Sequence, residues 1–191
     1  MILTVRIVIL VKDLKIIETF IFVTDTLRYL SLHDNRYLRY FKGHRSRVVS
    51  LAMSPHDDSF ASASLDYTIR FWDLKSNNCR ALLNTSDGRS SIAFDPKYEH
   101  VIAVATPINQ VKMFDDRYLD KGPFATHFID ANPLDFIDAQ YSPKGSHLLL
   151  STTKSIVVLN PMTGATVRCF FLFFLQHFET DTLLGARIFA R

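Results

Sequence analysis

Residues 43–73 read GHRSRVVSLAMSPHDDSFASASLDYTIRFWD, and they carry the clearest structural signals in the chain. Three short β-prone runs lie inside it, at residues 48–53, 60–64 and 68–72. The sequences SPHDD and LDY separate these runs, and both are rich in residues that favour turns. Short strands joined by tight polar turns predict an antiparallel β-meander.

A Gly-His pair opens the stretch and a Trp-Asp pair closes it, with 27 residues between the two pairs. With these pairs the stretch resembles one WD repeat, which folds as a four-stranded propeller blade. The resemblance implies a buried structural tetrad of His44, Ser62, Asp66 and Trp72, in which Ser62 stands ten and Asp66 six residues before Trp72. The four groups must be satisfied together, because each would be costly to bury alone.

A His, a Ser and an Asp also permit a hydrolase, with Ser62, His44 and Asp66 as its triad. Such a triad needs an exposed nucleophile on a strained turn, beside an oxyanion hole. Ser62 stands instead inside a predicted strand, in the sequence ASAS, and the chain has no G-x-S-x-G motif. We therefore favour the structural role and predict no enzyme and no catalytic residue.

The sequence pattern of this stretch repeats along the chain. Its Met-Ser-Pro turn returns twice, at intervals of 41 and 47 residues, as MSP 53–55, FDP 94–96 and YSP 141–143. Its Phe-Trp-Asp strand end also returns, at intervals of 42 and 45 residues, as FWD 71–73, MFD 113–115 and VLN 158–160. Periods of about 40 to 45 residues are typical of propeller blades. The later repeats lack a Gly-His start, and Ile108 stands in the slot of Asp66, so we expect them to pack without the polar tetrad.

The composition excludes several classes of protein. Of the 191 residues, 48% are hydrophobic and 13% aromatic, which rules out a disordered chain. The net charge of +3 is too small to indicate direct nucleic-acid binding. The 2 Cys have no metal-ligand spacing and no disulfide framework, and with 6 Gly there is no phosphate-binding loop. We therefore predict no metal and no cofactor.

The two ends of the chain differ from the repeats. Residues 1–23 are apolar but interrupted by charges, whereas spanning a bilayer takes about 20 apolar residues, so no membrane span is expected. We predict an N-terminal segment at residues 1–23 outside the repeat pattern, a propeller fragment at 24–170 and an atypical tail at 171–191. The expected fold is all-β: an incomplete β-propeller of about three WD40-type four-stranded blades plus fragments, since closed propellers have about 4–8 blades.

Several stretches resemble one WD-repeat family more closely. They are LRYLSLHDN at residues 27–35, YFKGH at 40–44, RVVSL at 47–51, SLD at 64–66, IRFWDL at 69–74 and DKGPF at 120–124. They are similar to the WD-repeat subunit of Set1/COMPASS-type histone methyltransferase complexes, and most of all to its plant members. The resemblance covers roughly residues 26–170 and implies a chain truncated at both ends.

This resemblance implies a non-catalytic scaffold in the nucleus. The expected protein partners are subunits of a histone lysine methyltransferase complex and the tail of transcribing RNA polymerase, with chromatin reached through the complex. Two alternatives stay open. One is a generic WD40 interaction adaptor, for example in a phosphatase or transcript-termination complex, and the other is a truncated gene product without function.

Arg45 and Arg47 are the candidate partner-binding residues. They precede the first inner strand of the complete repeat, at the rim that WD repeats use for partners. Both belong to a basic cluster with Arg36, Arg39 and Lys42, in which Tyr and Phe are interleaved. For the cluster as a whole, the alternation of an outer strand with solvated charges is the simpler interpretation.

Overall fold

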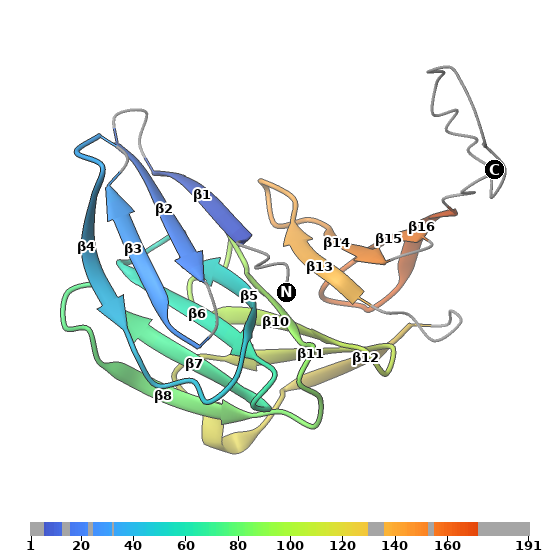
Figure 1. Ribbon diagram of the computed structural model, residues 1–191. Helices are drawn as coiled ribbons and strands as arrows, with labels where there is room; N and C mark the ends of the chain where they lie inside the picture. Colours follow the sequence, from blue (N-terminus) through green and yellow to red (C-terminus); the bar gives the residue numbers. More distant parts are fainter. Residues whose placement is uncertain are drawn as a thin grey trace, which may run out of the picture.

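The computed structural model describes residues 6–12, 16–22, 25–31, 33–129, 136–152 and 155–171. These residues form four sheets of four strands, and sequence neighbours within each sheet pair antiparallel. A single turn of 3-10 helix, Leu119–Lys121, interrupts the third sheet before its last strand. The all-β class predicted from the sequence is confirmed (Figure 1).

The strands follow the chain in order. The first sheet holds β1 (Arg6–Lys12), β2 (Ile16–Phe22), β3 (Leu27–Ser31) and β4 (Arg36–Phe41). The second holds β5 (Val48–Met53), β6 (Ser59–Ser64), β7 (Thr68–Asp73) and β8 (Cys79–Asn84). The third holds β9 (Ser91–Phe94), β10 (Val101–Thr106), β11 (Gln110–Asp115) and β12 (Ala125–Phe128). The fourth holds β13 (Phe136–Tyr141), β14 (Leu148–Thr152), β15 (Ser155–Leu159) and β16 (Thr166–Phe171).

Local chemistry explains where these strands turn. Between β5 and β6, the Ser54 hydroxyl accepts the backbone N–H groups of His56 and Asp57, both at 3.3 Å. The β3–β4 and β7–β8 turns contain Asn35 and Asn77, whose φ angles are 49° and 59°. Asn adopts this left-handed conformation more readily than most residues, so it suits both turns.

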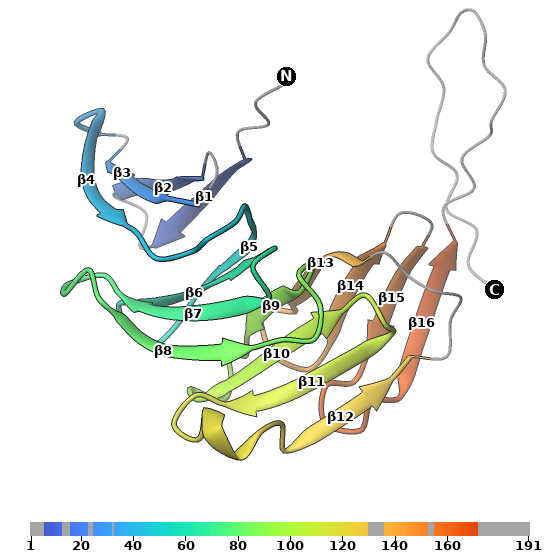
Figure 2. The ribbon, with the colours of Figure 1, turned by 60° about the horizontal axis from the view of Figure 1, so that its bottom comes forward.

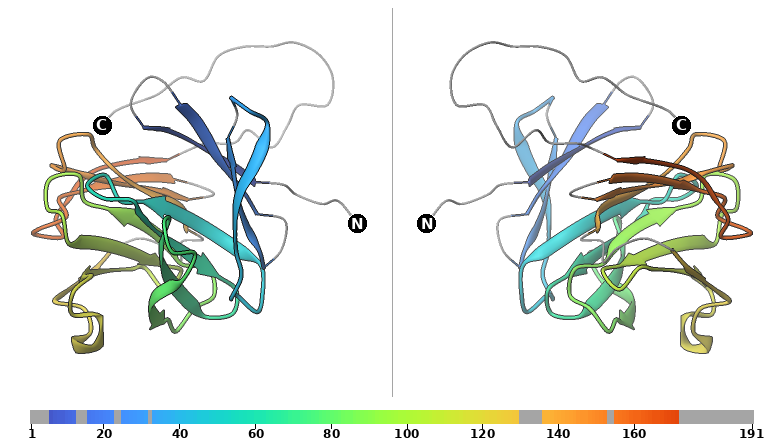
Figure 3. Two further views of the ribbon diagram at one scale, coloured as in Figure 1. Left: turned by 90° about the vertical axis from the view of Figure 1, so that its left-hand side faces the viewer. Right: turned by 90° about the vertical axis from the view of Figure 1, so that its right-hand side faces the viewer.

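The four sheets follow one another along an arc, with the first and fourth sheets at its two ends (Figure 2). The inner strands β5, β9 and β13 lie beside one another on the concave side of this arc. Figure 3 shows the same succession from either side, with the orange fourth sheet beside the green and yellow third sheet. The described sheets therefore form an open, propeller-type arc.

Each junction between consecutive sheets is filled by its own apolar cluster. The first junction, between sheets one and two, contains Leu27, Tyr29, Phe41, Val48, Phe60 and Trp72. The second contains Ala61, Ala63, Ile69, Phe71, Ile92, Phe94, Ile102, Val104, Phe114 and Leu119. The third contains Ala93, Ala103, Ala105, Val111, Met113, Ile129, Ala139, Leu148, Leu150, Val157 and Leu159. Burial of these faces against neighbouring sheets holds the arc together.

The number of sheets differs from the sequence expectation of about three blades plus fragments. Residues 1–23 are set apart from the repeats by their sequence, yet β1 and β2 pair in continuous register and β2 pairs with β3. These two strands complete the first sheet. The segment has no Gly or Pro to mark a repeat, so its β-branched content indicated strands without indicating a blade. Of the tail at 171–191, residues 172–191 lie outside the described residues.

Candidate functional site

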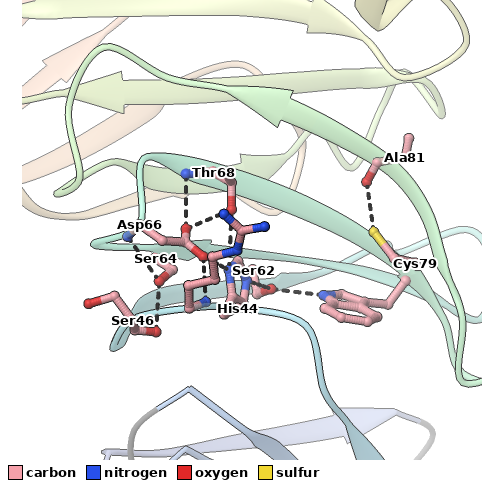
Figure 4. A network of polar contacts seen from close by, with 10 residues as sticks. His44, Ser46, Ser62, Ser64, Asp66, Thr68, Cys79 and Ala81 are labelled. Atoms are coloured by element: carbon pink, nitrogen blue, oxygen red, sulfur yellow. Dashed lines mark hydrogen bonds and ion pairs between the residues drawn. The ribbon is translucent and has the colours of Figure 1, made fainter.

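The four residues of the predicted tetrad belong to the second sheet and to the β4–β5 connection that precedes it. His44 lies in the connection between β4 and β5, Ser62 on β6, Asp66 in the β6–β7 turn and Trp72 on β7. The structure brings all four together, and Figure 4 shows His44 lying between Asp66 and Ser62. The entry loop, a strand and a turn thus meet at one imidazole ring.

The tetrad forms one directed chain of hydrogen bonds. The Trp72 indole N–H donates to the Ser62 hydroxyl over 2.8 Å, and Ser62 Oγ lies 2.7 Å from Nε2 of His44. On the other side of the ring, Nδ1 of His44 lies 3.0 Å from Asp66 Oδ2. Ser62 must then donate its proton to Nε2 while Nδ1–H donates to the carboxylate. The network assigns a neutral His44 protonated at Nδ1, and every member has a partner.

Electrostatics agree with this assignment. Burial lowers the pKa of His44 despite the opposing influence of the Asp66 carboxylate, so the imidazole stays neutral. Burial opposes ionisation of Asp66, but hydrogen bonds from Thr68, the Arg45 N–H and His44 outweigh it and lower the pKa of Asp66 to about 2. The site therefore holds one carboxylate charge, which hydrogen bonds satisfy.

Two groups that were not predicted from the sequence complete the network. Thr68 donates both its hydroxyl, over 2.6 Å, and its backbone N–H, over 3.0 Å, to Oδ1 of Asp66. The backbone N–H of Arg45 donates to Oδ2 over 2.8 Å. An Asp followed two residues later by Thr is the signal of an Asx-turn, and it could have identified Thr68. The N–H of Arg45 has no sequence signal, because any residue but Pro supplies one.

The network is buried beneath an aromatic cluster. Ser62 is 0% exposed, Trp72 1% and His44 5%. The Trp72 ring stacks on Phe60 and meets Phe41 edge-on, with centroid distances of 6.2 and 5.7 Å. Because the Ser62 hydroxyl is enclosed and bonded on both sides, it lacks the exposure that a nucleophile needs. Chemically, the arrangement ties a loop, a strand and a turn together.

The side chains of the other predicted residues lie apart from this network. The side chains of Arg45 and Arg47 are exposed in the β4–β5 connection, at the rim of the second sheet. The carbonyl of Arg47 accepts the N–H of Leu65 over 2.9 Å, which fixes this loop against the β6–β7 turn. In the third sheet Ile108, in the slot of Asp66, is 51% exposed.

No group of three or more His, Cys, Asp or Glu side chains is arranged to hold a metal ion among the described residues. Within the same residues, no helix has the length and apolar character needed to cross a membrane.

Comparisons with known proteins agree with the WD-repeat resemblance of the sequence. Residues 35–73 match the family model described as WD domain, G-beta repeat. The chain is 47% identical over 141 residues to "Protein ANTHESIS POMOTING FACTOR 1" of Arabidopsis thaliana, covering 73% of this chain and 42% of that protein. It is 45% identical over 138 residues to "WD repeat-containing protein 82" of Drosophila melanogaster, covering 72% and 43%.

A third relative is named for its complex. The chain is 39% identical over 135 residues to "Set1 complex component swd2" of Schizosaccharomyces pombe, covering 67% of this chain and 36% of that protein. The chain thus spans less than half the length of each of these curated relatives. With its sheets, its tetrad and these matches taken together, the chain contains a WD repeat and resembles the WD-repeat component of Set1-type complexes.

Proposed function

We propose that the chain is a non-catalytic WD40 scaffold of a Set1/COMPASS-type histone lysine methyltransferase complex in the nucleus. The observation that carries this proposal is the 39% identity to a protein named as a Set1 complex component, over 67% of this chain. The enclosure of Ser62 within the tetrad supports a structural role for the only triad-like set that the sequence offered. Chromatin and transcribing RNA polymerase are then reached through the complex, without direct binding of nucleic acid.

The proposed contact surface is the rim formed by the β4–β5 connection. Its anchor is rigid, because Arg45 and Arg47 are held by their backbones to the β6–β7 turn. Their guanidinium groups remain exposed, so they are available to acidic groups of a protein partner. A rigid backbone carrying free Arg side chains is suited to protein recognition.

The test is affinity purification of the tagged chain from nuclear extract, followed by mass spectrometry. We expect methyltransferase-complex subunits to copurify, and Arg45→Glu or Arg47→Glu to reduce their recovery. Lys144→Glu is the matched control, because Lys144 is also exposed but lies in the β13–β14 turn. Recovery of phosphatase or transcript-termination subunits alone would instead favour a different adaptor role. A folded chain that recovers no such subunit would overturn the proposal.

A further inference from the structure

The β6–β7 turn holds an aromatic residue in a backbone conformation that such residues rarely adopt. Tyr67 lies in the left-handed region, with a φ angle of 63°. A bulky residue is an outlier there, because its Cβ crowds the carbonyl oxygen that follows. Asn109 stands five residues before Phe114, as Tyr67 stands five residues before Trp72, and its φ angle is 58°. The second sheet thus carries a strained Tyr where the third sheet carries an Asn, which suits this conformation.

The hydrogen bonds of the two turns are the same and do not require a tyrosine ring. The carbonyl of Tyr67 accepts the backbone N–H of Thr85 over 2.8 Å, and the carbonyl of Asn109 accepts that of Ile129 over 2.9 Å. Only main-chain atoms form these bonds, so another residue that tolerates the conformation would serve. The Tyr67 side chain is 57% exposed, more than any other tyrosine of the chain. Strained residues of this kind cluster at ligand-binding sites, so we looked for charged groups around this turn.

Two other chain segments meet the turn that carries Tyr67. The β4–β5 connection, which contains Arg45 and Arg47, is hydrogen-bonded to the turn through its backbone. The β8–β9 connection also approaches the turn closely. At Gly88 in this connection, a Cβ would lie only 3.0 Å from a main-chain carbon of the turn. Arg89 follows Gly88 directly, so the chain places an arginine beside the turn in both connections.

These arginines have no acidic partner within the described part of the chain. Arg45, Arg47 and Arg89 are exposed, and their side chains make no hydrogen bond or ion pair with another described residue. The Asp66 carboxylate in the same turn does not neutralise them. Its side chain is 7% exposed and already accepts hydrogen bonds from the tetrad and from Thr68. The three guanidinium groups are therefore available to an external anion.

The two ends of the second sheet differ in charge. At the rim, the two connections and the turn contain more basic than acidic residues: Lys42, Arg45, Arg47 and Arg89 against Asp66 and Asp87. At the opposite end, residues 54–58 and 73–78 contain more acidic than basic residues: Asp57, Asp58 and Asp73 against Lys75. Lys75 is also paired there, with Nζ 3.2 Å from Oδ2 of Asp58. Charge complementarity therefore favours an acidic partner at the rim end.

We propose that the rim binds an acidic segment of a protein partner, and that Tyr67 and Arg89 belong to the binding surface together with Arg45 and Arg47. A large apolar side chain of the segment packs on the Tyr67 ring, while its carboxylates contact the arginines. A tyrosine ring supplies rigid contact area at a low cost in conformational entropy, and the Arg fork matches a carboxylate. The inference deepens the proposed function and rests on it for the role of Arg45 and Arg47.

The test measures binding of the full chain to short fluorescein-labelled peptides by fluorescence anisotropy. One peptide consists of glutamates around a central phenylalanine, a second has alanine in place of that phenylalanine, and a third has lysines in place of the glutamates. We expect the first peptide to bind more tightly than the second, and the third not to bind. Arg89→Glu should weaken both glutamate peptides about fivefold, because it removes a charge pair and adds repulsion. Lys144→Glu should leave both affinities unchanged.

Tyr67→Asn separates recognition from a structural role of the ring. It should weaken binding of the phenylalanine peptide about two- to tenfold, the range of one aromatic pair, and leave binding of the alanine peptide unchanged. Because Asn tolerates the left-handed conformation, the same change should raise the melting temperature by about 2–4 °C. Tyr98→Asn is the matched control, since Tyr98 is 41% exposed but lies in the β9–β10 turn, away from the rim. It should alter neither affinity.

The peptide measurement contains no methyltransferase subunit, so its failure is distinct from failure of the proposed function. Peptide binding by a chain that recovers no Set1-type subunit would support this surface and reject the complex. The proposal is overturned if the native chain binds no glutamate peptide, or binds the lysine peptide equally well. It is also overturned if Tyr67→Asn lowers the melting temperature and leaves the affinity for the phenylalanine peptide unchanged, because the ring would then serve the fold alone.

Discussion

Replacing Trp72 with Ala should lower the free energy of unfolding by more than the loss of its packing contacts alone. The indole is 1% exposed and packs on Phe60 and Phe41, and removing such a ring costs about 3–5 kcal/mol. The Ser62 hydroxyl also loses its N–H donor, which adds about 1–3 kcal/mol for an unpaired buried acceptor. The sum approaches the whole stability of a small domain, about 5–15 kcal/mol.

Two companion variants separate these contributions. Phe114→Ala removes a ring that is 5% exposed and has no hydrogen-bonding atom, so it should lose only the packing term. Trp72→Phe keeps most of the ring but deletes the N–H, so it should lose about 1–3 kcal/mol. The assay is urea unfolding followed by far-ultraviolet circular dichroism, because Trp72 is the only Trp and its fluorescence disappears in two of the variants. Equal losses for Trp72→Ala and Phe114→Ala, with no loss for Trp72→Phe, would refute a polar network through Trp72.

The remaining predictions concern pH and backbone strain. Folding lowers the pKa of Asp66 from its ordinary 3.8 to about 2. The ionised carboxylate therefore stabilises the fold fully above pH 3.8, and this contribution is lost as the pH falls toward 2. Asp66→Asn should flatten this part of an acid-unfolding curve. Burial lowers the pKa of His44, so stability should also decline as the pH falls below 6.5, the ordinary pKa of His. The stability of His44→Gln should lack this part of the pH dependence. Gly164→Ala should lower the melting temperature more than Gly122→Ala, since both residues have positive φ but only at Gly164 would a Cβ collide with the His127 ring.

Much of this fold was predictable because its signals are local. Turn residues and a period of about 40 to 45 residues marked the second, third and fourth sheets, and fixed offsets indicated that His44, Ser62, Asp66 and Trp72 form one network. The strands β1 and β2 could be expected only as β-prone segments. They complete the first sheet because β2 pairs with β3. No turn motif in their own sequence predicts this pairing.

The contacts between sheets were the least predictable features. Arg39 looked like a solvated charge on an outer strand, yet it bonds to a turn 36 to 38 residues away. Its acceptors are a backbone carbonyl and the amide oxygen of Asn77, and the sequence does not reveal the hydrogen-bond partner of either type of group. Thr68 was missed for a related reason, since its role depends on the conformation that Asp66 imposes on the turn.

Direct binding is the sharpest test of the proposal that this chain is a scaffold for a Set1-type complex. The measurement is titration calorimetry of the purified full chain into a recombinant Set1-type methyltransferase complex assembled without its own WD-repeat component. We predict saturable binding that Arg45→Glu and Arg47→Glu weaken and Lys144→Glu leaves unchanged. No detectable binding by a chain that circular dichroism shows to be folded would contradict the claim.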